Sequence, residues 1–262
     1  MKRYVLAVGG SDSSGGAGIQ ADIRTITSLG AHAFTAATAV TAQNSRGVLV
    51  IHRVPARVVL EQIQAVLHDL APDAVKIGML LSGTTAREVA RVVKRNKLSC
   101  VVLDPVLRAS TGKALLEPAA LSVLKKELLP VVSVVTPNLD EAQALSGKRV
   151  KNLKDMEEAS KFIKAMGPDV VITGGHLSKE CVDLFYDGKE FHRFRSSKIR
   201  TKYTHGTGCV FSSALATFLA LGYDTFSSAK KAHDFTRQAI KEGYPSGRGT
   251  GTLCPEKAAG TL

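Results

Sequence analysis

The 262-residue sequence contains no tryptophan, and aromatic residues make up only 5% of it. Proteins that bind single-stranded nucleic acid stack bases on aromatic side chains interleaved with basic ones, and the sequence shows no such pattern. Its formal net charge is +12, but the positive residues are dispersed along the chain. The charge therefore indicates a solvated surface that attracts anionic substrates, and we expect no nucleic-acid partner.

Long apolar runs and closely spaced cysteine pairs are also missing. No run approaches the ~20 apolar residues that span a bilayer, so we expect no membrane association. The first apolar stretch stops after Val8 and leads into Gly-Gly-Ser-Asp, which is typical of a β-strand rather than a signal peptide. The cysteines form no C-x-x-C pair, which argues against a zinc ribbon or a disulfide framework. We therefore expect a cytoplasmic protein with reduced thiols at Cys100, Cys181, Cys209 and Cys254.

Short apolar runs alternate with helical patterns along nearly the whole chain. This alternation predicts a single α/β domain, residues 1–262, with a mostly parallel sheet that helices cover on both faces. Asp187-Gly188 predicts a hairpin between the last two strands. The expected strands are Tyr4–Gly9, Phe34–Ala42, Val48–Val54, Ala74–Met79, Cys100–Asp104, Val131–Thr136, Val170–Thr173, Val182–Tyr186 and Glu190–Phe194. The expected helices are Gly18–Ser28, Ala56–Leu70, Thr84–Lys94, Pro118–Leu128, Leu139–Ser146, Lys154–Met166, Gly208–Leu221 and Ser227–Glu242.

The strongest chemical signal is the segment Thr204-His205-Gly206-Thr207-Gly208-Cys209, which opens an apolar helix. Glycines let the backbone turn its N–H groups toward a ligand, and the helix dipole adds positive potential, so the segment suits a phosphoryl group. A thiol in the first helical turn is expected to have a lowered pKa, which makes Cys209 a candidate base or nucleophile. The alternative is a tight turn with a structural cysteine.

Two carboxylates lie just beyond expected strand ends. Asp104 follows Val-Val-Leu, and Glu141 follows Asn-Leu-Asp. Carboxylates at this edge of a parallel sheet can hold Mg²⁺, usually through waters, beside ATP phosphates. The alternative for each is a helix N-cap or first-turn acid that stabilises the helix dipole.

The remaining polar candidates also follow strands. Gln43 can donate and accept side by side, which matches the edge of an aminopyrimidine. The loop Gly9–Gly18 is glycine-rich but is neither a Walker A loop nor a dinucleotide fingerprint, so a tight turn and a ligand contact are both open. His176 and His205 lack a third spaced ligand, which disfavours a metal site.

Together these segments resemble the hydroxymethylpyrimidine and phosphomethylpyrimidine kinases of thiamine biosynthesis, in the ribokinase-like superfamily. The resemblance covers most of the chain, in order, from Gly9 to Phe211. Its most specific parts are the segments Gly10–Asp22 and Thr204–Phe211; the others are Thr41–Asn44, Lys76–Leu80, Leu103–Val106, Thr136–Ala142 and Gly174–His176. The resemblance implies a three-layer α/β/α sandwich without the separate lid of the sugar kinases, usually dimeric, and a reaction that uses ATP and Mg²⁺.

The resemblance also implies a role for each matched residue. Cys209 is the base that deprotonates the substrate hydroxyl, where the sugar kinases carry aspartate, and Gln43 reads the ring edge. The pyrimidine pocket is lined by Gly10, Asp22, Gln43, Met79 and Val106. The metal is organised by Asp104 and Glu141, and the ATP phosphates lie near Asn138, Thr173, Gly206, Thr207 and Gly208.

Two departures from the family pattern bear on the phosphate side. Thr173 stands where the family commonly has lysine before Gly-Gly-His, so a positive charge is missing unless Lys76 or another cation replaces it. The segment Gly247–Leu253 differs from the usual glycine- and histidine-rich ending. Pyridoxal kinase, whose substrates are also flat heterocycles with a hydroxymethyl group, remains the alternative activity. A non-catalytic ligand- or nucleic-acid-binding protein is the alternative from another class.

Overall fold

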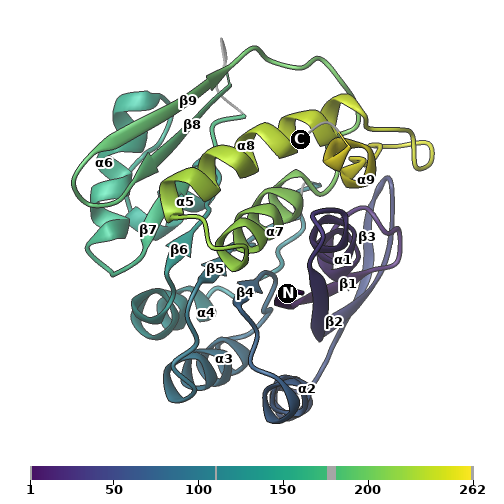
Figure 1. Cartoon of the computed structure of the whole chain (residues 1–262), viewed down its shortest axis with the longest axis vertical. Helices are drawn as coiled ribbons and strands as arrows, with labels where there is room; N and C mark the ends of the chain where they lie inside the picture. Colours follow the sequence, from purple (N-terminus) through teal and green to yellow (C-terminus); the bar gives the residue numbers. More distant parts are fainter. Residues whose placement is uncertain (1, 110, 176–180, 261–262) are drawn as a thin grey trace.

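The computed structural model of the chain describes residues 2–109, 111–175 and 181–260. A nine-stranded sheet with the order β3-β2-β1-β4-β5-β6-β7-β8-β9 forms its centre (Figure 1). The six strands from β2 to β7 in this order are parallel, whereas β3, β8 and β9 run antiparallel to their neighbours. The strands are β1 (Tyr4–Asp12), β2 (His32–Asn44), β3 (Gly47–Arg53), β4 (Ala74–Ile77), β5 (Val101–Leu103), β6 (Val134–Val135), β7 (Asp169–Ile172), β8 (Cys181–Tyr186) and β9 (Phe191–Ser196).

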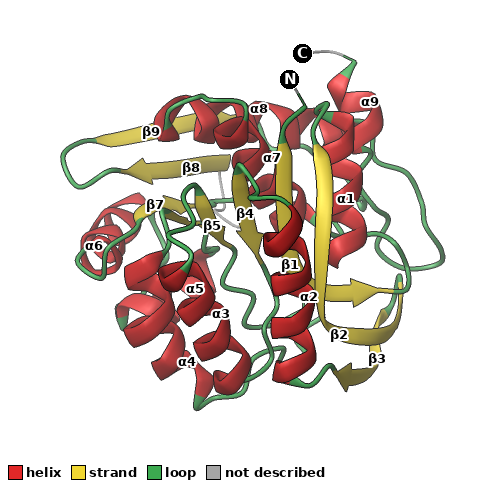
Figure 2. Ribbon diagram, turned by 60° about the horizontal axis from the view of Figure 1, so that its bottom comes forward, coloured by secondary structure: helices red, strands yellow, loops and turns green. Residues whose placement is uncertain are grey.

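Two hydrophobic cores lie on opposite faces of the sheet. Successive side chains of a strand point to opposite faces, and in β1 the residues Leu6 and Val8 enter one core while Val5 and Ala7 enter the other. Helices α2, α3, α5 and α6 pack into the first core, and α1, α7, α8 and α9 pack into the second. Figures 1 and 2 show these two helical layers on either side of the strands. The predicted three-layer α/β/α sandwich is therefore confirmed.

The helices are α1 (Gly18–Ser28), α2 (Ala56–Asp69), α3 (Gly83–Arg95), α4 (Ala120–Val123), α5 (Leu139–Ser146), α6 (Leu153–Lys164), α7 (Thr207–Ala220), α8 (Thr225–Lys241) and α9 (Pro255–Ala259). Side-chain caps fix several of their starts. Ser82, Asn152 and Asp224 each accept a hydrogen bond from a backbone N–H in the first turn of α3, α6 and α8. These caps satisfy backbone donors that have no partner inside the helix.

All nine expected strands are present, although the expected strand Val131–Thr136 is shortened to β6 (Val134–Val135). The other main differences concern helices. The expected helix Pro118–Leu128 is instead the short α4, a π-helical turn η1 (Leu124–Leu128) and a 3₁₀ turn η2 (Leu129–Val131). Pro130 has no N–H to continue the helix, which explains the irregular end. Helix α9 was not predicted, because five residues are too few for a helical period to show.

The topology places ligand-binding loops at one edge of the sheet. β1 lies between β2 and β4, and α1 covers one face of the sheet while α2 and α3 cover the other. Crevices at such switch points, outside the carboxyl ends of the strands, are where open α/β sheets bind ligands. Among the described residues, no helix combines the length and the apolar character that crossing a bilayer requires.

Candidate active site

The loop after β1 and the turn before α7 meet backbone to backbone. Gly206 caps α7 with a φ of 90°, and a Cβ at this position would lie 1.9 Å from the carbonyl oxygen of Gly16. A Cβ on Gly16 would lie 2.4 Å from Cδ2 of His205. Only glycine fits either position, since any side chain would collide with the facing loop. Gly16 and Gly206 therefore allow the loop after β1 and the turn before α7 to pack against each other.

Cys209 lies in the first turn of α7, as predicted. The expectation of a lowered thiol pKa is wrong. Burial, together with the negative charges of Asp22 and Asp104, raises the pKa of Cys209 to about 12, although Lys76 acts in the opposite direction. Desolvation of the thiolate here outweighs the helix N-terminus, whose effect is modest.

A buried ion pair is part of the charged surroundings of this thiol. Lys76 on β4 and Asp22 on α1 are 1% and 0% exposed, and their Nζ and Oδ1 atoms are 2.8 Å apart. The hydroxyl of Ser213 on α7 donates to the same Oδ1 at 2.7 Å. Although burial alone would lower it, attraction to Asp22 raises the pKa of Lys76 above its usual value. Lys76 is therefore a buried, paired cation and does not replace the charge missing at Thr173.

Asp104 and Glu141 form a second acidic region, and no ion-pair partner of either occurs among the described residues. Asp104 follows β5 and accepts a hydrogen bond from Ser212 at 3.2 Å. Burial, together with Asp22, raises the pKa of Asp104 to about 6 despite Lys76. Burial and repulsion by Asp104 raise the pKa of Glu141 to about 8. The two carboxylates thus lie within electrostatic reach of each other in a site that disfavours their charged forms.

Glu141 also has the structural role that the sequence left open. Its Oε2 accepts from the N–H of Asn138 at 2.9 Å, and the Oδ1 of Asn138 accepts from the N–H of Glu141 at 3.0 Å. This capping box starts α5. It leaves each carboxylate oxygen a further lone pair, so capping and metal binding are compatible.

The donor set fits Mg²⁺ better than a transition metal. Within the described part of the chain, no three His, Cys, Asp or Glu side chains converge as a metal-binding group. Mg²⁺ in phosphoryl-transfer sites is held by one or two carboxylates, with waters and phosphates completing the shell. Asp104 and Glu141 match that pattern, and bound Mg²⁺ would offset the repulsion that raises their pKa values.

The phosphate-side residues Asn138 and Thr173 end neighbouring strands. They form an isolated parallel bridge, and the N–H of Thr173 donates to Pro137 at 2.9 Å. The next N–H, of Gly174, donates to Asp183 on β8 at 2.9 Å. His176, named above as a metal candidate and matched to the family, lies outside the described residues.

Asp183 and His233 are site-supporting residues that sequence reasoning missed. Nδ1 of His233 on α8 lies 2.6 Å from Oδ2 of Asp183, and both side chains are buried. Through the N–H of Gly174, this pair holds the first residues after β7. No local pattern marks it, because the two residues are 50 positions apart and meet only in the folded chain.

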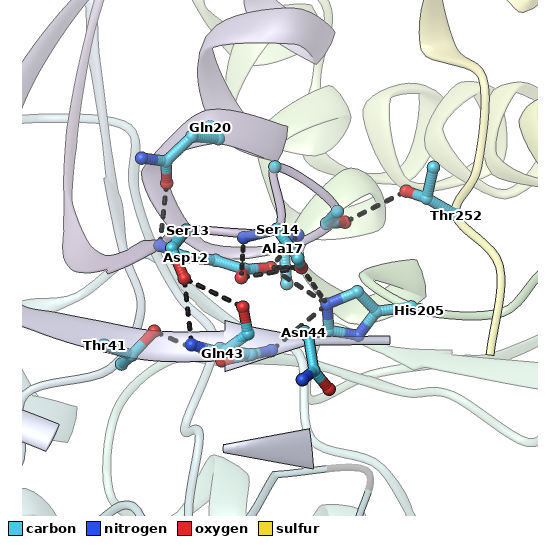
Figure 3. Close-up of polar contacts among 12 residues, drawn as sticks. Asp12, Ser13, Ser14, Ala17, Gln20, Thr41, Gln43, Asn44, His205 and Thr252 are labelled. Atoms are coloured by element: carbon cyan, nitrogen blue, oxygen red, sulfur yellow. Dashed lines mark hydrogen bonds and ion pairs between the residues drawn. The ribbon is translucent and has the colours of Figure 1, made fainter. Parts of the chain in front are cut away.

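Gln43 belongs to a polar network that joins three segments (Figure 3). Nε2 of His205 lies 2.9 Å from Oδ2 of Asp12 and 3.2 Å from Nε2 of Gln43. Although burial acts to raise it, hydrogen bonds from His205, from Ser14 and from the backbone lower the pKa of Asp12 to about 2. Nε2 of His205 donates to Asp12, so His205 is held by a carboxylate partner rather than grouped with metal ligands, and Gln43 lies beside this pair at the end of β2.

The apolar members of the predicted pyrimidine pocket come together. A Cβ on Gly10 would lie 2.2 Å from Cε of Met79, so glycine makes room for this side chain. Met79 belongs to a buried cluster with Ala39, and Val106 packs against that cluster. Asp22 lies deeper, and its Oδ2 is buried without a hydrogen-bond partner among the described residues. The structure therefore groups Gly10, Met79 and Val106, while the roles of all five residues stay predictions.

The divergent C-terminal segment packs against the turn between β2 and β3. Gly249 donates its N–H to the hydroxyl of Ser45 at 3.0 Å, and Thr250 donates to the carbonyl of Ser45 at 2.9 Å. Thr252 forms a bridge with His205. The segment thus borders the Gln43 side of the site.

Known proteins show the same organisation. The sequence profile described as phosphomethylpyrimidine kinase matches residues 12–254. A hydroxymethylpyrimidine/phosphomethylpyrimidine kinase of Streptomyces coelicolor is 44% identical over 250 residues, which are 95% of this chain and 93% of that protein. A thiamine biosynthesis bifunctional protein of Geobacter sulfurreducens is 45% identical over 251 residues, and the chain spans about half of it, 51%.

Solved structures share the fold over nearly the whole chain. An ADP complex of Bacillus subtilis pyridoxal kinase superposes with a TM-score of 0.92 at 35% identity, covering 100% of both chains. A phosphomethylpyrimidine kinase of Clostridium difficile superposes with a TM-score of 0.82 at 36% identity, covering 91% of this chain and 100% of that one. The protein is thus a ribokinase-like α/β protein, and the chain belongs to the phosphomethylpyrimidine kinase family.

Proposed function

We propose that the protein is an ATP-dependent kinase that phosphorylates 4-amino-5-hydroxymethyl-2-methylpyrimidine, its monophosphate, or both, in thiamine biosynthesis. The observation that carries the proposal is the proximity of a thiol, a glycine-rich helix N-terminus and a carboxylate pair. A Cβ on Gly208, next to Cys209, would lie 3.6 Å from Oδ2 of Asp104. This proximity supports the proposal that a base, an anion site and a metal site adjoin at one edge of the sheet.

In this proposal each part has a defined task in phosphoryl transfer. The backbone N–H groups of Gly206, Thr207 and Gly208 stabilise the charge of the transferred phosphoryl group. Asp104 and Glu141 hold Mg²⁺, which supplies further charge neutralisation beside the phosphates. With the hydroxymethyl substrate, the thiolate of Cys209 takes the proton from the hydroxyl as the hydroxyl oxygen attacks the γ-phosphorus of ATP and the bond to ADP breaks. With the monophosphate, a phosphate oxygen that is already anionic makes the same attack and needs no base.

The raised pKa of Cys209 sets a condition on this role. Only a thiolate accepts the proton, and the surroundings of Cys209 favour the thiol form. Lys76 already favours the thiolate, and a cation at Asp104 would offset one of the two charges that oppose it. A metal ion bound at Asp104 would therefore favour the thiolate form of Cys209.

For the substrate, we propose a flat pyrimidine that contacts Gly10, Met79 and Val106, with its amino edge at Gln43. The grouping of the first three residues and the position of Gln43 at the end of β2 support this orientation. Pyridoxal or pyridoxine is the second candidate substrate, favoured by the high TM-score with a pyridoxal kinase.

A coupled ADP-release assay tests the proposed function. The five acceptors are hydroxymethylpyrimidine, its monophosphate, pyridoxine, pyridoxal and ribose. We expect a higher kcat/KM for the two pyrimidines than for the other three, and no turnover without Mg²⁺. Preference for pyridoxal would move the assignment to the second candidate. A salt-sensitive gel shift with nucleic acid, and no ADP release with any acceptor, would contradict both.

We further propose a single-domain cytoplasmic homodimer. One continuous sheet supports the single domain. The side chains of Val40, Leu49 and Val50 are 50%, 67% and 58% exposed on the β2–β3 ribbon, and exposed apolar surface of this kind supports self-association. The proposed use of ATP as phosphoryl donor supports the cytoplasmic location. Light scattering after size-exclusion chromatography would test the dimer, with a mass near 27.8 kDa contradicting it.

A further inference from the structure

A hollow adjoins the candidate active site on the side of Gln43. Its volume is about 460 Å³, and it lies between the loop after β1, the β2–β3 turn and the C-terminal segment. Figure 3 shows the part of its wall that Ser13, Ser14, Gln43 and Asn44 contribute. The other lining residues are Ser45, Arg46, Ser246, Gly247 and Arg248.

Hydrogen bonds join the three walls of this hollow. Ser13 donates its hydroxyl to the carbonyl of Gln43 at 2.8 Å and accepts the N–H of Gln43 at 2.8 Å. Ser45 accepts from Gly249 through its hydroxyl and from Thr250 through its carbonyl. The hollow is therefore a formed feature of the fold rather than a gap between independent loops.

The charge of the hollow has one sign. Arg46 and Arg248 are its only charged lining residues. Both are exposed, and neither forms an ion pair within the described ranges. The nearest carboxylate of the network, Asp12, is already held by His205 and Ser14. Two guanidinium groups favour a phosphate monoester, which guanidinium binds through paired hydrogen bonds.

Gln43 places this hollow beside the proposed pyrimidine pocket, which we take as its mouth, because Gln43 lines the hollow and is also the residue proposed to bind the amino edge of the ring. The two substrates of the proposed function differ in charge: the hydroxymethyl compound is neutral, and its monophosphate is an anion. A positive site at the mouth therefore distinguishes them before either reaches Cys209.

We propose that Arg46 and Arg248 form a capture site for the phosphate group of the pyrimidine monophosphate. The inference rests on the proposed function. The site raises the rate at which the anionic substrate is bound, and phosphoryl transfer itself takes place at Cys209. Steering of this kind changes association rates by about 10–10³-fold and weakens as salt screens the charges.

The test compares the two substrates in one variant. In Arg46→Gln/Arg248→Gln we expect kcat/KM for the monophosphate to fall about tenfold at low ionic strength, with a smaller loss at physiological salt. The values for hydroxymethylpyrimidine and the KM for ATP should stay within about twofold. Arg46→Lys/Arg248→Lys retains the charge and should recover most of the loss.

A matched control removes the same charge elsewhere. Arg95 ends α3 and Arg149 follows α5, so both lie toward the opposite edge of the sheet from the strand-end loops. Arg95→Gln/Arg149→Gln should leave the monophosphate kinetics unchanged. An equal loss in this control would show an effect of net charge, and a loss for both pyrimidines or for ATP would show another role. Each of these results would overturn the proposal.

The binding kinetics of the monophosphate give a second readout that does not depend on turnover. We expect slower association in Arg46→Gln/Arg248→Gln and unchanged association of hydroxymethylpyrimidine; equal association rates of wild type and variant for the monophosphate would overturn the inference. Inorganic phosphate competing as well as the monophosphate would show a general anion site and would likewise overturn it. Absence of turnover in the wild type would instead count against the proposed function alone.

Discussion

Asp22 and Asp104 are both buried carboxylates in the charged surroundings of Cys209, yet they are neutralised in different ways. Asp22 has Lys76 at 2.8 Å, a cation from the chain itself. Burial raises the pKa of Asp22, and its ion pair with Lys76 opposes that rise. Asp104 forms no ion pair in the described structure; burial and Asp22 raise its pKa to about 6 although Lys76 acts in the opposite direction, and burial and Asp104 raise the pKa of Glu141 to about 8.

This difference separates a structural charge from a functional one. A buried charge that the fold pairs internally leaves nothing for a ligand to neutralise, whereas an unpaired carboxylate pair requires protons or an external cation. The contrast therefore supports Mg²⁺ at Asp104 and Glu141, and it assigns Lys76 to the fold and to the electrostatics of Cys209. Substitutions at these residues test whether the two acidic regions differ in this way.

Cys209→Ala should have the largest effect, because it removes the proposed base, the thiol whose pKa is raised by Asp22 and Asp104. A general base commonly contributes about 10²–10⁴-fold, so we expect kcat to fall by that order while ATP affinity changes little. Pre-steady-state ADP release and ATP-analogue binding would measure the two quantities. Cys209→Asp, which restores a base, should recover some activity; an undiminished kcat in Cys209→Ala would remove the thiol from the chemistry.

Lys76→Met should destabilise the protein by about 3–5 kcal/mol, because it leaves the Asp22 carboxylate buried without its cation. Urea unfolding at pH 7 would measure the loss. The double variant Asp22→Asn/Lys76→Met should regain most of it, since no charge is then left unpaired. Unchanged stability in Lys76→Met would show that Asp22 is not held as an anion by Lys76.

The raised pKa values of Asp104 and Glu141 predict a pH-dependent stability in the absence of metal. A carboxyl group whose pKa is higher in the folded than in the unfolded state stabilises the fold below its unfolded value of about 4, and this contribution is lost as pH rises. Between pH 6 and 8, deprotonation of Glu141 should lower the free energy of unfolding by about 2–3 kcal/mol. Glu141→Gln should flatten this decline, and so should Mg²⁺; a decline of the same size in the variant would contradict the assignment.

Thr173→Lys should have the smallest effect, a gain of up to about tenfold in ATP affinity or kcat. Thr173 ends β7 beside Asn138, and Lys76 is already paired with Asp22, so an added charge would meet the phosphates without a competing cation. Steady-state kinetics with varied ATP would measure it, with Thr173→Ser as the neutral control. No gain, or a loss, would indicate that a different residue supplies the charge.

Features that depend on neighbouring residues could be predicted from the sequence, and features that depend on contacts between distant segments could not. The strands and most helices were predicted because apolar periodicity is local, and Cys209 was placed at the start of α7 because the glycines beside it are neighbours in sequence. The direction of its pKa shift was not predictable, since burial and the charges of Asp22 and Asp104 come from distant segments. The Asp183–His233 contact was missed for the same reason.

Direct measurement of metal affinity tests the contrast between the two acidic regions most closely. Mn²⁺, which reports binding through its paramagnetic resonance, would be titrated into the protein with a non-hydrolysable ATP analogue, for wild type, Asp104→Asn, Glu141→Gln and Asp22→Asn/Lys76→Met. We predict that Asp104→Asn and Glu141→Gln each weaken Mn²⁺ binding by about tenfold or more, as loss of one charged ligand should, while the double variant retains the wild-type affinity. Equal Mn²⁺ affinity in wild type and both single variants would contradict the account.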